Sequence, residues 1–228
     1  MKVERWLNTI FVIFLLFALV GCGKEERRGN RAQKSNAKKE TVLGSEHSSE
    51  ADDKNKNVNK TGDDKVLVVY FSYEGDLEKV ANWIADETGG DLLEIKPKEP
   101  YSDNFDETVE RAKKEQDENL RPEIEVALTE DEFKSYDTVF FGFAVWWHDL
   151  PMVMCTFLEK YDFSGKKIIP FFSHQGSYDG KKAMETLYKL TVGGSVKSDM
   201  ALSIHKDEIY KSEHEVRIWV DGIGYGKE

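Results

Sequence analysis

Continuous apolar runs alternate with amphipathic stretches from Lys65 onward. Residues 66–71 (VLVVYF), 138–144 (TVFFGFA) and 167–172 (KIIPFF) are rich in β-branched and aromatic side chains. Uninterrupted runs of this kind are typical of strands that are buried on both faces of a parallel sheet. Residues 92–95 and 195–203 predict two weaker strands, so five strands are expected in all.

Helical patterns separate these strands. Apolar side chains recur at helical spacing from Leu77 to Ala85, and Gly89 and Gly90 predict the end of that helix. Further helices are expected over residues 106–119, from Pro151 onward, and over residues 183–190 and 209–220. Strands that alternate with helices predict an α/β fold, with a doubly wound parallel sheet and helices on both faces. A single domain is expected over residues 65–228.

The first 22 residues have a different pattern. Lys2 and Arg5 precede an unbroken apolar run over residues 10–20, which is too short to span a bilayer and has the size of a signal-peptide core. The run ends in Leu-Val-Gly-Cys at residues 19–22, which resembles the lipobox of bacterial lipoproteins. This resemblance implies that residues 1–21 are a signal peptide and that the Cys22 thiol receives a diacylglyceryl group.

Residues 22–64 contain almost no large apolar side chains and are rich in Lys, Glu, Ser, Asn and Asp. Such a segment cannot bury enough surface to offset its ordering entropy, so we expect a disordered tether. The diacylglyceryl group would supply two acyl chains, such as palmitate, and two chains suffice for stable membrane anchoring. The domain is therefore expected on the extracytoplasmic face of the cell membrane, held there through the lipid on Cys22.

The net charge of −11 over 228 residues argues against nucleic acid as a partner, because phosphate backbones require a basic surface. Only two cysteines are present, Cys22 and Cys155, so a disulfide framework is not expected, and Cys155 is interpreted as a buried apolar residue. The acidic residues of the 103–110 stretch lack the spacing of a known metal site.

Ligands of open doubly wound sheets bind beyond the carboxyl ends of the strands. Three loops meet this description, and we call residues 72–77 loop 1, residues 145–150 loop 2 and residues 173–178 loop 3. Loop 1 leads into a helix N-terminus, which favours an anion such as phosphate. The candidate cofactor-binding residues are Ser72, Tyr73, Glu74, Gly75, Asp76, Leu77, Ala144, Val145, Trp146, Trp147, His148, Ser173, His174, Gln175, Gly176 and Ser177.

The chain resembles the flavodoxin family from about Val66 to its C-terminus. The likeness is strongest to the branch with a Trp-Trp pair after the third strand, here in AVWWHDLP at residues 144–151. Further matching stretches are EIKP at 94–97, RAK at 111–113, DFSGK at 162–166 and IPF with SH at 169–174. The resemblance implies strand order 2-1-3-4-5 and non-covalently bound FMN.

Loop 1 departs from the family pattern. Glu74 and Leu77 stand where the family has hydroxyl side chains, and Asp76 replaces an amide. Two lost hydrogen bonds cost about 1 kcal/mol each, and a carboxylate about 5 Å from a phosphate costs roughly 3 kcal/mol per unit charge. The sum, about 2–5 kcal/mol, corresponds to FMN affinity reduced roughly 30- to 4,000-fold. His148 and Gln175 also replace residues that are commonly glycine.

Two interpretations remain open for several side chains. Trp146 and Trp147 either form a wall for a flavin ring or pack against the helix that follows Pro151. His174 either contacts the edge of the ring or anchors its loop, and His148 is interpreted as an exposed loop histidine.

Three functions are compatible with these features. The leading hypothesis is a membrane-anchored flavodoxin-like protein that binds FMN and transfers electrons to an unidentified redox partner or small acceptor. An alternative, favoured by Glu74 and Asp76, is a fold that has lost FMN and acts as a surface binding module. A flavin-dependent NAD(P)H or quinone reductase is a second alternative.

Overall fold

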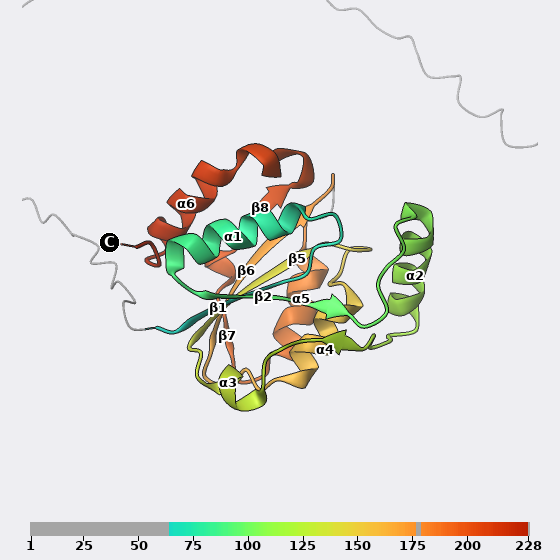
Figure 1. Cartoon of the computed structure of the whole chain (residues 1–228), viewed down its shortest axis with the longest axis horizontal. Helices are drawn as coiled ribbons and strands as arrows, with labels where there is room; N and C mark the ends of the chain where they lie inside the picture. Colours follow the sequence, from blue (N-terminus) through green and yellow to red (C-terminus); the bar gives the residue numbers. More distant parts are fainter. Residues whose placement is uncertain (1–63, 177–178, 228) are drawn as a thin grey trace, which may run out of the picture. The chain divides into compact units, whose positions relative to one another are not determined.

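A central parallel sheet forms the middle layer of the domain. The computed structural model describes residues 64–176 and 179–227; the predicted signal peptide, Cys22, most of the tether and Ser177 lie outside them. Strands β1 (Val66–Tyr70), β2 (Asp91–Glu94), β5 (Thr138–Ala144) and β6 (Lys167–His174) lie in the order β2-β1-β5-β6 and pair in parallel (Figure 1). These are the strands that the apolar runs predicted.

The fifth strand position corrects the sequence-based prediction. Instead of one strand over residues 195–203, two short strands pair with successive parts of β6: β7 (Ser195–Val196) and β8 (Leu202–His205). A 3-10 turn, η1 (Ser198–Met200), separates them, because polar side chains there interrupt the apolar alternation that a longer strand would need. The two strands share one edge, so the predicted order 2-1-3-4-5 is confirmed.

Helices cover both faces of the sheet (Figure 1). Helices α1 (Asp76–Thr88) and α6 (Glu213–Gly222) bury their apolar sides with Val68 and Phe140 of the sheet. On the opposite face, α4 (Met152–Lys160) and α5 (Lys181–Leu190) pack with Val69 and Phe141. Because successive strand residues point to opposite faces, each continuous apolar run supplies both cores.

The final helix begins later than residues 209–220 predicted. Residues Lys206–Lys211 form the 3-10 helix η2, and α6 follows only after Ser212. The Ser212 hydroxyl donates to the carbonyl of Glu208 at 2.7 Å, which closes the first element. Ile209 and Val216 are buried in the same core, so the apolar pattern runs through the junction and hides it.

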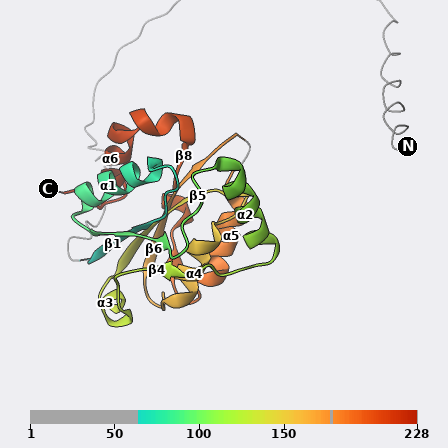
Figure 2. The same ribbon diagram turned by 45° about the vertical axis from the view of Figure 1, so that its right-hand side comes forward.

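The segment between β2 and β5 forms a small additional layer of short strands and helices. Strand β3 (Lys96–Pro97) pairs antiparallel with β4 (Ile124–Glu125), and α2 (Phe105–Asp117) lies between them in the chain. Figure 2 shows α2 standing beside the α4 and α5 layer. The short helix α3 (Glu130–Lys134) then leads into β5. The polar pattern predicted α2, whereas β3, β4 and α3 are too short to leave a periodic pattern.

The centre of the sheet is closely packed. A Cβ atom on Gly142 would lie 2.2 Å from the Phe171 ring, so only glycine fits there beside the neighbouring strand. In the part of the chain that the structure describes, no helix has the length and apolar character needed to cross a bilayer.

Candidate functional site

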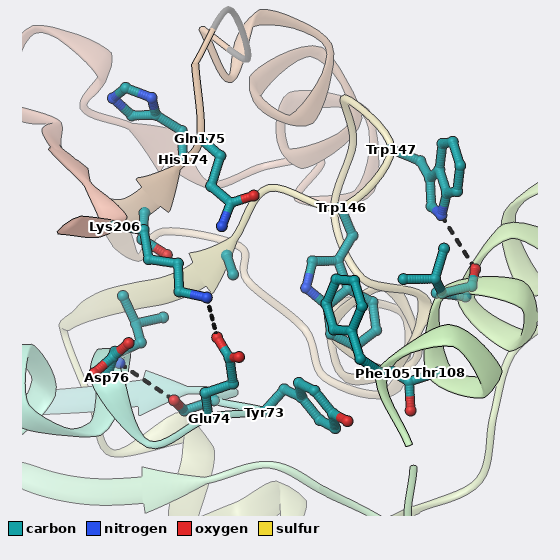
Figure 3. A pocket seen from close by; sticks show the side chains of 16 residues that line it. Tyr73, Glu74, Asp76, Phe105, Thr108, Trp146, Trp147, His174, Gln175 and Lys206 are labelled. Atoms are coloured by element: carbon teal, nitrogen blue, oxygen red, sulfur yellow. Dashed lines mark hydrogen bonds and ion pairs between the residues drawn. The ribbon is translucent and has the colours of Figure 1, made fainter. Parts of the chain in front are cut away.

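A pocket opens at the carboxyl ends of the strands, where the three predicted loops converge (Figure 3). Its volume of about 340 Å³ lies within the range of roughly 300–1,000 Å³ that is typical of small-molecule sites. The lining combines loops 1, 2 and 3 with one side of α2 and the first residue of η2. The residues are Ser72, Tyr73, Glu74, Asp76, Leu77, Phe105, Thr108, Val109, Ala112, Ala144, Trp146, Trp147, Ser173, His174, Gln175 and Lys206.

Loop 1 turns sharply from β1 into α1. Gly75 has a φ of 81°, a left-handed conformation that glycine adopts without strain, and it directly precedes the first residue of α1. The Ser72 hydroxyl accepts a hydrogen bond from the backbone N–H of Leu77 at 3.2 Å. One of the free N–H groups at the start of α1 is therefore satisfied within the loop.

Both acidic side chains of loop 1 have cationic partners. The carboxylate of Glu74 pairs with the ammonium group of Lys206, which extends from η2 on the far side of the loop (Figure 3). Asp76 pairs with Lys79 at 3.1 Å, one turn along α1. The repulsion that the isolated acidic residues predict is thus opposed by two positive charges, and a ligand phosphate would meet a loop close to neutral.

Loop 2 forms a tight reversed turn. Trp146 and Asp149 exchange backbone hydrogen bonds of 3.0 and 2.9 Å, and Trp147 and His148 between them have φ angles of 48° and 69°. Two consecutive left-handed residues are the geometry of a type I′ turn, in which glycine or asparagine is preferred. The prediction that His148 replaces a glycine is consistent with this strained conformation.

The two tryptophans of loop 2 have different surroundings. Trp146 meets the rings of Phe71, Tyr73 and Tyr101 edge-on or nearly so, at centroid distances of 5.4, 6.1 and 5.1 Å. Trp147 is 39% exposed, and its indole N–H approaches the Val109 carbonyl at 3.4 Å. Trp146 is therefore a fixed wall of the pocket, whereas Trp147 lies against α2 at the rim.

Helix α2 holds loop 2 in place. The Gln116 side-chain amide donates to the Trp146 carbonyl at 2.6 Å. One residue earlier, the buried Glu115 accepts hydrogen bonds from the Tyr101 hydroxyl at 2.7 Å and from Arg111 Nε at 2.8 Å. Burial, together with the adjacent Glu115 carboxylate, raises the pKa of Tyr101. Tyr101 thus stays a neutral donor and supports Trp146 from behind.

Loop 3 contributes an amide and a pair of imidazoles. Figure 3 shows the Gln175 amide reaching toward the cavity and the His174 ring turned away from Trp146. The His174 ring lies 5.5 Å from that of His205, whose Nε2 accepts from the Gly176 N–H at 3.4 Å. Among the described residues, the buried Nδ1 of His174 has no hydrogen-bond partner. His174 thus has a ring contact with His205, but among the described residues no hydrogen bond anchors it, so both interpretations of His174 stay predictions. The Gln175 amide is the loop 3 group that reaches toward the cavity (Figure 3).

Most of the predicted residues line one pocket. Gly75, Val145, His148 and Gly176 shape their loops but do not line it, and Ser177 lies outside the described residues. The sequence analysis missed five lining residues: Phe105, Thr108, Val109, Ala112 and Lys206. The first four recur at helical spacing on one side of α2, and this pattern could have identified them. Lys206 leaves no such pattern.

Other candidate chemistry is limited. Within residues 64–176 and 179–227, no group of three or more His, Cys, Asp or Glu side chains is placed to hold a metal ion. Cys155 is 2% exposed on α4, and burial raises its pKa to about 12, so its thiol stays protonated at neutral pH.

Comparisons with known proteins agree with this architecture. Two crystal structures described as flavoproteins, from Bacteroides eggerthii and Bacteroides uniformis, are each 27% identical to this chain. They cover 70% and 69% of it and 98% of their own chains, with TM-scores of 0.56 and 0.57. A Lactobacillus acidophilus flavoprotein in complex with FMN, 23% identical, covers 65% of this chain and 97% of its own with a TM-score of 0.52, which supports the fold alone.

A comparison of the sequence with curated proteins gives no significant match. The sequence model of the flavodoxin family matches residues 65–223, which is the whole described domain apart from its ends. The match includes the three loops of the pocket. The chain therefore belongs to the flavodoxin family.

Proposed function

We propose that this chain binds FMN non-covalently in the pocket between loops 1, 2 and 3 and acts as an electron-transfer protein. The observation that carries the proposal is the pocket itself. It lies at the switch in strand order, between β1 and β5, with the rigid aromatic wall of Trp146 on one side and a cationic group, Lys206, on the other (Figure 3).

The residues present fit both ends of an FMN molecule. Trp146 and Tyr73 offer apolar surface for a flat ring system, and the exposed Gln175 amide provides hydrogen-bonding groups beside it. At the other end, the start of α1 and the Lys206 ammonium group suit a phosphate. The Bacteroides neighbours, each 27% identical to this chain, are described as flavoproteins, which supports a flavin cofactor here.

The bound flavin would supply reversible electron transfer, and the protein would supply its surroundings. The aromatic cluster around Trp146 excludes water from one face of the ring. The net charge of −11 disfavours additional negative charge on the cofactor, and this lowers its reduction potential. The hydrogen bond from Gln116 keeps the Trp146 carbonyl turned toward α2.

The visible spectrum of the purified full chain tests this function. Flavin absorption bands after purification, or after addition of FMN and removal of the excess, are the expected result. Absence of both would favour the alternative of a surface module without cofactor. Steady oxidation of NAD(P)H by the loaded protein alone would instead favour a reductase.

We further propose that the chain is a lipoprotein of the Trp-Trp branch, anchored through Cys22 on the extracytoplasmic side of the membrane. The lipobox-like residues 19–22 and the polar segment that follows them support this. Radiolabelled palmitate supplied to cells should label the wild-type chain, and Cys22→Ser should abolish the label. Equal labelling of both proteins would contradict lipidation at Cys22.

A further inference from the structure

The single lysine in the pocket lining lies close to the acidic loop 1. Lys206 is the only Lys or Arg among the described residues that line the cavity. It is the first residue of η2, directly after β8, and is far from loop 1 in sequence. Its ammonium group nevertheless forms an ion pair with Glu74, and Figure 3 shows the pair facing Trp146 across the cavity.

This ion pair is open to exchange. The side chains of Lys206 and Glu74 are 31% and 47% exposed, and ion pairs at such positions contribute little net stability. Neither side chain has a second ion-pair partner among the described residues. Asp76, the other acid of the loop, pairs with Lys79 along α1 and does not contact Lys206. Lys206 can therefore change partners without disturbing the core.

A phosphate monoester is a stronger partner than a carboxylate for such a lysine. It carries a charge of about −1.5 to −2 at neutral pH and has three acceptor oxygens. The hydroxyl side chains that the family uses here are replaced by Glu74 and Leu77, and the Ser72 hydroxyl already accepts from Leu77. Lys206 is consequently the one cationic donor of the lining that is available to a phosphate.

We propose that Lys206 is the phosphate-recognising residue of this pocket and that Glu74 is an internal competitor, which holds Lys206 until a phosphate monoester displaces the carboxylate. The proposal rests on the proposed function, since it assigns the end of the pocket that takes the FMN phosphate. It makes the pair a specificity determinant: FMN must compete with Glu74, whereas riboflavin, which has no phosphate, need not.

A double-mutant cycle on the full chain measures this competition. FMN and riboflavin are titrated into wild type, Glu74→Gln, Lys206→Gln and the double variant. We expect Glu74→Gln to tighten FMN binding about tenfold and Lys206→Gln to weaken it about fivefold. In the Glu74→Gln background the loss on Lys206→Gln should grow to about thirtyfold, because no carboxylate then competes for the lysine. Riboflavin affinity should change less than about twofold throughout.

Asp76→Asn is the matched control, because it removes the other acidic charge of loop 1 without touching Lys206. Its effect on FMN binding should be the same in the wild-type chain as in the Lys206→Gln variant, within about twofold. A second, flavin-free readout uses inorganic phosphate and the backbone amide NMR signals of residues 74–78. These signals should shift at lower phosphate concentration in Glu74→Gln than in wild type, and not in Lys206→Gln.

The outcomes separate this proposal from the proposed function. Equal effects of Lys206→Gln on FMN and riboflavin, or additive effects of Glu74→Gln and Lys206→Gln, would overturn the competition while FMN binding stands. Lysine-dependent phosphate shifts without binding of either flavin would support the competition and overturn the proposed cofactor. Absence of flavin binding and of phosphate shifts would overturn both.

Discussion

Loops 1 and 2 face each other across the same pocket but are held by different interactions. Loop 2 is fixed by the edge-on contacts of Trp146 and by the hydrogen bond from Gln116, with the buried Glu115 behind them. Loop 1 is closed by the hydrogen bond from the Leu77 N–H to the Ser72 hydroxyl, and it carries the partly exposed ion pair between Glu74 and Lys206. The pocket thus combines a rigid aromatic wall, which suits a flat ring, with a lysine in an exchangeable ion pair, which suits an anionic group.

This difference predicts that the two loops respond differently to substitution. When one partner of a buried hydrogen bond is removed, the other partner stays buried and unsatisfied, and the free energy of unfolding falls by its full desolvation penalty. Removal of an exposed ion pair lowers the stability of the protein only slightly. Its main effect is on the affinity of the pocket for charged ligands. Variants of loop 2 should therefore alter both folding and binding, and variants of loop 1 should alter binding with little effect on folding.

Trp146→Ala should have the largest effect. Loss of its contacts with Phe71, Tyr73 and Tyr101 should lower the free energy of unfolding by about 2–3 kcal/mol, because the side chain is half-buried. Affinity for FMN should fall roughly 30- to 150-fold through loss of the aromatic wall. Urea denaturation and flavin fluorescence measure the two effects. Trp147→Ala, at the exposed rim, should weaken binding no more than about fivefold, and equal effects of the two variants would refute the distinction between them.

Glu115→Ala comes next, with a loss of about 2 kcal/mol in the free energy of unfolding. The substitution leaves the Tyr101 hydroxyl and the Arg111 guanidinium without their partner, a carboxylate that is only 4% exposed. Denaturant unfolding provides the measurement. Glu110→Ala, on the exposed side of the same helix, should change stability by less than about 0.5 kcal/mol. A similar loss for both variants would show that the buried network does not support loop 2.

Gln116→Met should cost about 1 kcal/mol, because it removes one hydrogen bond to the Trp146 carbonyl while the bond from the Asp149 N–H remains. Faster amide hydrogen exchange at residues 146–149 is the direct readout. Lys114→Met changes an exposed position in the same turn and should leave exchange in loop 2 unaltered. Unchanged exchange in Gln116→Met would mean that α2 does not hold the loop.

Ser72→Ala should have the smallest effect on folding, about 0.5–1 kcal/mol, through loss of the hydrogen bond from the Leu77 N–H. Thermal unfolding without ligand measures this change. Ser203→Ala, at an exposed position on β8, serves as the control. A loss larger than that of Gln116→Met would reverse the order of rigidity between loops 1 and 2.

Much of the fold could be predicted because buried parallel strands leave uninterrupted apolar runs. The runs at residues 66–71, 138–144 and 167–172 correspond to β1, β5 and β6. The predictions of one continuous fifth strand and one continuous final helix were wrong, because each of these segments is divided into two elements. At both places apolar residues occur on either side of or within a 3-10 element, so the segment resembles one longer element. A 3-10 element this short has no periodic pattern by which the sequence could reveal it.

The candidate site was predictable where it is local in sequence. Loops 1, 2 and 3 follow strands directly, so topology brings them together. Lys206 could not be placed, because its contact with Glu74 depends on how β8 returns to the edge of β6. For the same reason, the sequence could not show that the Glu74 carboxylate is paired, because its cation is distant in the sequence and close only in the folded chain.

The central claim is that this pocket binds FMN despite the acidic residues of loop 1. Titration of the full chain into a fixed concentration of FMN, followed by flavin fluorescence, tests it most directly. The account predicts saturable binding of one FMN per chain at micromolar or lower concentration, with reduced affinity in Trp146→Ala. No change in fluorescence up to high micromolar protein concentration would contradict it.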